Sequence, residues 1–110
     1  MSGKRSRDKG KRGEREWASF LRTRGWTTAR RGVQHQGGPD APDVVCPELE
    51  GFHFEVKRTE RLSLYDAMAQ ARADAGGKVP IVAHRRNKCE WLVVLRAEDF
   101  SELLRGIGDG

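Results

Sequence analysis

The sequence predicts a single α/β domain over residues 9–105, in which a central mixed sheet of about five strands is flanked by helices. Three observations predict this class. A chain of 110 residues can bury one modest core and is too short for two. Apolar residues recur with helical spacing in some segments, and alternate or form short runs in others. The elements then follow the order helix, three strands, helix, two strands, helix, which suits a sheet covered by helices.

The chain begins with a basic segment that leads into an amphipathic helix. Residues 1–8 are small, polar and basic, and we expect a disordered tail there. A helix is predicted over residues 9–24, because apolar side chains from Trp17 to Leu21 recur at helical spacing. Gly25 follows at the position where glycine commonly ends a helix.

Five short segments have the composition of strands. They are residues 26–30, 43–46, 51–57, 79–84 and 90–95. In the third of them the apolar Phe52, Phe54 and Val56 alternate with the polar His53, Glu55 and Lys57, so the strand has one apolar and one polar face. The glycines and prolines between the first two strands predict a loop over residues 31–42.

Two further helices complete the expected domain. Ser63 and Asp66 have the spacing of a capping box and predict a helix that begins at residue 63 and ends near residue 75. A short terminal helix is predicted over residues 98–105, and the tail 106–110 is expected to be flexible.

The charge is concentrated at the amino-terminal end. Residues 1–31 hold 11 Lys or Arg against three acids, net +8, whereas residues 32–110 are net −3. Arginine outnumbers lysine 15 to 6, and its guanidinium donates paired hydrogen bonds to phosphate oxygens. A basic end on a chain with a pI near 9.7 favours nucleic acid as the partner, and a solubilising tail is the alternative.

The same composition excludes several classes of protein. No apolar run approaches the roughly 20 residues of a transmembrane helix, and the basic start is not followed by a secretory signal. Cys46 and Cys89 stand far apart, so neither a zinc knuckle nor a disulfide scaffold is expected. We therefore expect a cytoplasmic protein without a membrane partner.

Three carboxylates and one lysine have unusual positions. Glu14 shares the apolar face of the first helix, where a carboxylate needs a partner, although fraying of the helix or pairing with a nearby arginine would also explain it. Asp43 and Asp40 both follow a proline. Local pattern does not separate them, but we favour Asp43 because an apolar run begins directly behind it.

Glu55 and Lys57 lie two apart and project from one face of their strand. An acid followed by lysine at this spacing occurs about once by chance in such a composition, so a plain surface ion pair is an alternative to a functional site. His53 lies on the same face, where it either supports the site or is simply exposed.

Together these residues suit phosphodiester hydrolysis. Mg²⁺ binds one or two carboxylates, activates water and relieves charge on the phosphate. Asp43, Glu55 and Glu14 would supply the ligands, and Lys57 would orient water or offset charge. The basic residues expected to hold the DNA backbone are Arg30, Arg31 and Arg58, with Arg85 and Arg86 in a basic hairpin loop.

Several stretches of the sequence resemble a known family. The stretches that carry the resemblance are Gly13-Glu14-Arg15-Glu16-Trp17 with Gly25-Trp26 and Arg30, Pro42-Asp43-Val44-Val45, Phe54-Glu55-Val56-Lys57-Arg58-Thr59, and residues 76–83. They are similar to the archaeal-type Holliday junction resolvases and their bacteriophage-encoded relatives, within the PD-(D/E)xK nuclease superfamily. The extra Pro39-Asp40 pair and the loop 34–38 depart from the family pattern.

The resemblance implies a restriction-endonuclease-like core and a homodimer that cuts four-way DNA junctions symmetrically with Mg²⁺, for which Mn²⁺ can substitute. It implies metal binding by Asp43 and Glu55, completed by Glu14, with Lys57 as the catalytic lysine. It also implies DNA contacts for Arg15 and Arg30 and a supporting role for Gln70. The alternatives are a related nuclease or nickase acting on other DNA structures, and a nucleic-acid-binding module without catalysis.

Overall fold

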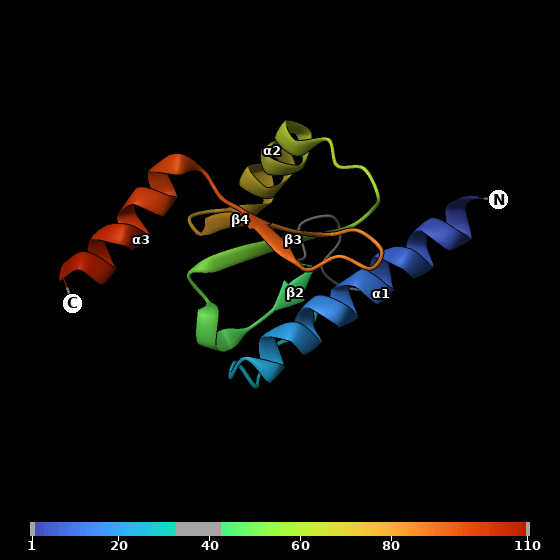
Figure 1. Cartoon of the computed structure of the whole chain (residues 1–110), viewed down its shortest axis with the longest axis horizontal. Coiled ribbons are helices and arrows are strands. Elements are labelled where there is room, and N and C mark those ends of the chain that lie inside the picture. The colour runs from blue at the N-terminus through green and yellow to red at the C-terminus, as the bar shows by residue number, and fades with distance from the viewer. Residues whose placement is uncertain (1, 33–42, 110) are drawn as a thin grey trace.

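The computed structural model of the chain describes residues 2–32 and 43–109 (Figure 1). Its helices are α1 (Ser2–Thr23), α2 (Leu64–Ala75) and α3 (Ala97–Asp109), with a short 3-10 helix η2 (Pro47–Leu49). Its strands are β1 (Arg30–Arg31), β2 (Val44–Val45), β3 (Phe52–Arg58), β4 (Val79–Arg85) and β5 (Leu92–Val94). Among the described helices, none has the length and apolarity needed to cross a membrane.

The five strands form one sheet in the order β1-β2-β3-β4-β5. Among the strands that the structure describes, only β3 and β4 are parallel, from Phe52 opposite Val79 to Arg58 opposite Arg85, and α2 makes the crossover between them. The other neighbouring strands are antiparallel. The predicted α/β class, with a five-stranded mixed sheet and flanking helices, is therefore confirmed.

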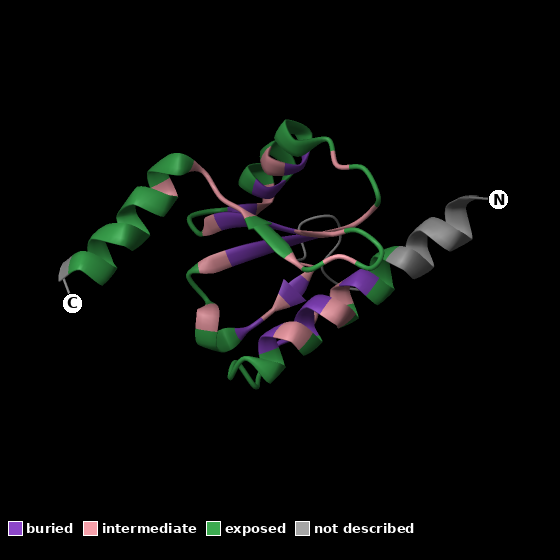
Figure 2. Ribbon diagram, in the orientation of Figure 1, coloured by how far each residue is buried: buried purple, intermediate pink, exposed green. Residues whose placement is uncertain are grey.

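The two faces of β3 are covered by different helices. Phe54 and Val56 lie in the larger core with Trp17 and Leu21 of α1, and this core is the buried layer between α1 and the sheet in Figure 2. On the opposite face, small residues of α2 pack closely over Val82 of β4. The alternation of apolar and polar residues along β3 thus places its apolar side chains in the core with α1, and its polar side chains face α2.

Most predicted boundaries agree with the structure to within two residues, and three segments differ by more. Helix α1 begins at Ser2 and not at residue 9, because its basic residues are good helix formers and continue the backbone hydrogen bonding. Helix α3 continues to Asp109 through the segment predicted to be a flexible tail. Of the strand predicted at residues 26–30, only the last residue is in β1: the amide of Ala29 bonds to the carbonyl of Trp26 and closes a turn.

Candidate active site

Strand β3 carries two of the predicted site residues on its α2 face. Glu55 is buried, with 4% of its surface exposed, and its Oε2 lies 3.5 Å from Nζ of Lys57. The Lys57 ammonium also donates a hydrogen bond of 3.0 Å to Oε1 of Gln70 on α2. The lysine is therefore held between the strand and the helix, and it keeps N–H donors for a further partner.

Asp43 joins these residues from the start of β2. In the register of the Val44–Phe54 pair, Asp43 comes opposite Glu55. The ladder ends there, and Oδ2 of Asp43 accepts a hydrogen bond of 2.8 Å from the backbone amide of Val56. The carboxylate therefore takes the place of a strand partner, which fixes its position.

The electrostatics of Asp43 show how closely the acids are gathered. The pKa of Asp43 is raised from 3.8 to about 7, chiefly by burial and next by the negative charge of Glu55. The hydrogen bond from Val56 lowers this pKa, Glu14 raises it, and Lys57 lowers it. A carboxyl group with so high a pKa lacks sufficient positive charge nearby, which is the environment that a bound cation would relieve.

Glu14 reaches the site from α1, and its charge contributes to the raised pKa of Asp43. Its Oε1 accepts a hydrogen bond of 2.8 Å from Nε of Arg31 on β1. A glycine allows the helix to lie close to the sheet: a Cβ at Gly13 would stand 2.5 Å from Cβ of Arg58 on β3. The close approach brings the following residue, Glu14, near the acidic cluster, and the pairing with arginine that the sequence left open is observed.

The predicted basic residues divide into two groups. Arg58 is 9% exposed and donates to Glu16, and Arg85 also donates to Glu16, at 2.9 and 3.0 Å. This pairing ties α1, β3 and β4 together, so both arginines serve the packing of the domain. Arg15, Arg30 and Arg86 are exposed at the surface.

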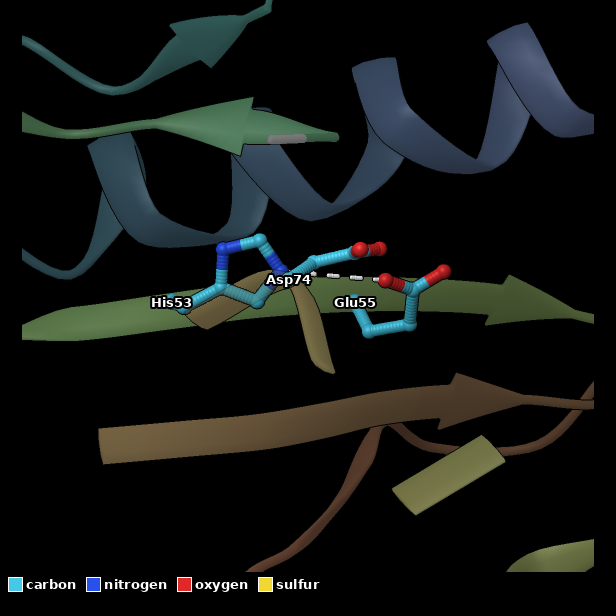
Figure 3. A group of neighbouring side chains, drawn as sticks. All are labelled: His53, Glu55 and Asp74. Atoms are coloured by element: carbon cyan, nitrogen blue, oxygen red, sulfur yellow. Dashed lines mark ion pairs between the residues drawn. The ribbon is translucent and has the colours of Figure 1, made fainter. Parts of the chain in front are cut away.

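Some of these contacts could not be found from sequence patterns. Glu16 lies two residues from Glu14 on the same helix, but its partners come from β3 and β4, far along the chain. Asp74 approaches His53 and Glu55 from α2 (Figure 3). Asp74 lies three residues after the buried Ala71, and this spacing, which places both on one face of the helix, was the signal that the sequence offered. Asp40, the alternative to Asp43, lies outside the described residues.

The acids at this edge fit a hard divalent cation. Asp43, Glu55 and Glu14 offer only carboxylate oxygens, which Mg²⁺ prefers over nitrogen or sulfur ligands. The raised pKa of Asp43 is the observation of this structure that supports the fit. Arrangements of carboxylates, a cation and a lysine are suited to hydrolysing a phosphodiester.

A comparison with protein families matches residues 5–106 to the archaeal Holliday junction resolvase family (Hjc). The chain belongs to this family. The resemblance in the sequence motifs is thereby confirmed, and the mixed sheet with its three helices is consistent with the Hjc fold. Membership implies a function in resolving Holliday junctions, which are four-way DNA structures. Neither the curated proteins nor the solved structures gave a match.

Proposed function

We propose that this Hjc-family chain is a Mg²⁺-dependent endonuclease that resolves four-way DNA junctions by paired, symmetric cleavage of phosphodiester bonds. The observation that carries the proposal is the meeting of Asp43, Glu55 and Lys57 at one edge of the sheet, with Asp43 at a pKa of about 7. A purely DNA-binding module would gain nothing from three acids gathered against a phosphate backbone.

Each residue has a distinct task in the proposed reaction. Asp43 and Glu55, with Glu14, would hold Mg²⁺, which supplies a more acidic water and offsets charge on the phosphate. Lys57, positioned by Gln70, would direct an N–H toward the attacked phosphate or the attacking water. The hydrogen bond from Val56 keeps the Asp43 carboxylate aimed into the site before substrate arrives.

The proposed DNA surface is the basic side of α1 and the strands next to it. Arg15, Arg30 and Arg86 are its exposed residues among those predicted from the sequence. Arginine contacts to phosphates position DNA without reading its sequence, which suits recognition by shape. Arg31, whose side chain pairs with Glu14, would link phosphate binding to the acidic site.

Paired cleavage requires two active sites, and we propose that the chain acts as a homodimer. Helix α3 points away from the sheet and makes few contacts with the rest of the chain (Figure 1). Its exposed apolar residues are Phe100, Leu103, Leu104 and Ile107. A second copy related by two-fold symmetry would cover the same surface on both chains and match the symmetry of the junction.

The test of the activity is cleavage of a synthetic four-way junction, beside matched duplex and single-stranded DNA, with Mg²⁺ or with EDTA. We expect two symmetric cuts on the junction only, and only with metal. Asp43→Asn and Lys57→Ala should abolish cleavage while junction binding is retained. Lys78→Ala, which removes an exposed lysine outside the site, is the matched control and should cut normally.

Other outcomes would overturn specific parts of the proposal. Cutting of duplex or flaps in place of junctions would keep the chemistry and refute the substrate. Tight junction binding without any cut, with Mg²⁺ or Mn²⁺, would indicate a binding module. The dimer is tested separately by sedimentation: Ile107→Asp should shift the chain to a monomer, and an unchanged mass would place the interface elsewhere.

A further inference from the structure

A second group of possible metal ligands lies behind the acidic edge, on the α2 face of β3. His53 and Glu55 come from the strand, and Asp74 comes from the last turn of α2 (Figure 3). One ligand atom from each of the three side chains lies within 4.8 Å of the other two. The cluster joins the proposed active site through Glu55, whose Oε1 faces His53 while its Oε2 faces Lys57.

In the part of the chain that the structure describes, the Nε2 atom of His53 has no hydrogen-bond partner. The residue is only 5% exposed, and its Nε2 is buried without a hydrogen bond. The distance of 3.8 Å from Nε2 to Oε1 of Glu55 is too long for a hydrogen bond. Burying a polar atom without a partner costs about 1–3 kcal/mol, and a cation shared with the two nearby carboxylates would supply this nitrogen with one.

The chemistry of the three donors differs from that of the Asp43 site. One imidazole nitrogen with two carboxylate oxygens suits Zn²⁺, whereas Mg²⁺ prefers oxygen alone. Bonds from zinc to these atoms are about 2.0–2.2 Å, so in tetrahedral coordination two ligand atoms stand about 3.4 Å apart. Nε2 of His53 and Oε1 of Glu55 stand 3.8 Å apart and all three ligand atoms lie within 4.8 Å of one another, so zinc binding would draw them together by up to about 1.4 Å.

From these observations we propose that His53, Glu55 and Asp74 form a zinc-binding site, with water completing the coordination. The site shares one carboxylate with the proposed active site and uses none of its other residues. Half-buried Asp74 gives access from solvent, while buried His53 and Glu55 form the floor. This inference does not depend on the proposed nuclease activity.

The test is a calorimetric titration of the full chain with Zn²⁺ alone, and thermal unfolding is the second readout. We expect one zinc per chain and an increase in Tm with zinc concentration, because a ligand that binds only the folded state stabilises it. Asp74→Asn and His53→Gln should each weaken zinc binding at least tenfold. Asp66→Asn, the same substitution at an exposed position in the first turn of α2, is the matched control and should bind zinc normally.

The variants also distinguish the proposed zinc site from the acidic edge that contains Asp43. Asp43→Asn should keep zinc affinity within about threefold of the original chain. Loss of zinc binding in Asp43→Asn with normal binding in Asp74→Asn would place the ion at the acidic edge and overturn the proposal. Absence of zinc binding by the unaltered chain would overturn it too. Asp74→Asn changes a half-buried side chain and tests the site even if His53→Gln fails to fold.

Discussion

Replacing Asp43 with asparagine should stabilise the metal-free protein at alkaline pH and have a much smaller effect in acid. The folded-state pKa of Asp43 is raised from 3.8 to about 7, chiefly by burial and by the charge of Glu55. The folded chain therefore holds the proton more tightly than the unfolded chain. The stability that this proton gives is fully present below pH 3.8 and is lost as the pH rises through about 7.

The size of the effect follows from the shift. A rise from 3.8 to about 7, at about 1.4 kcal/mol per pKa unit, sets a ceiling of about 4 kcal/mol. Asp43 is only partly buried, and solvent screening reduces the effect to about 2–4 kcal/mol at pH 8. Asparagine cannot ionise, and its side-chain oxygen can still accept the hydrogen bond from Val56. The variant should therefore not lose this stability at pH 8.

The assay is thermal or urea unfolding at pH 5 and pH 8, in EDTA and then in Mg²⁺. In EDTA at pH 8 we expect the Tm of Asp43→Asn to exceed that of the unaltered chain by about 10 °C. Mg²⁺ should raise the Tm of the unaltered chain and have little effect on the variant, because one ligand is missing. Asp66→Asn is the surface control. An equal gain at both pH values, or no gain at pH 8, would refute the reasoning.

Three further outcomes follow from contacts at α1. Gly13→Ala should lower the free energy of unfolding by about 1–3 kcal/mol despite alanine's better helix propensity, because its Cβ would stand 2.5 Å from Cβ of Arg58. An unchanged Tm, or an unchanged midpoint of urea unfolding, would disprove the close contact. Glu16→Gln should cost about 1–2 kcal/mol in the same assay, because Arg58 and Arg85 would lose their shared carboxylate, and a neutral result would show that their pairing is dispensable. Arg15→Ala should weaken junction binding and reduce its salt slope by about 1, measured by fluorescence titration at several NaCl concentrations; an unchanged slope would remove Arg15 from the DNA surface.

The parts of the fold that sequence could predict were those with strong periodicity. The alternation along residues 52–57 identified β3 and both of its faces, and the small residues of α2 marked a helix that packs closely on a sheet. Residues 26–29 were misread because β-branched threonines favour a strand, whereas the amide and hydroxyl of Thr28 donate hydrogen bonds to Glu48, far along the chain, and hold the turn. The start of α1 was misplaced because lysine and arginine favour helix while their charge suggests disorder.

The candidate site was predictable where its residues lie close in the sequence. Glu55 and Lys57 share a face by spacing alone, and Glu14 drew attention as a carboxylate on an apolar stripe. The pairing of Arg58 with Glu16 could not be read in advance, because it depends on how α1 crosses β3. The prediction of Arg58 as a DNA contact arose from its charge, and its low exposure came only from the packing.

Helix α3 has a consequence for how the chain folds. It has 13 residues, includes Gly106 and Gly108, and has little support from the sheet. An isolated helix of this length is marginal in water. Its ordering should therefore be coupled to whatever covers Phe100 and its apolar neighbours. Helix content measured by circular dichroism should then rise with protein concentration, so that dilution alone unwinds the carboxy-terminal end while the sheet stays intact.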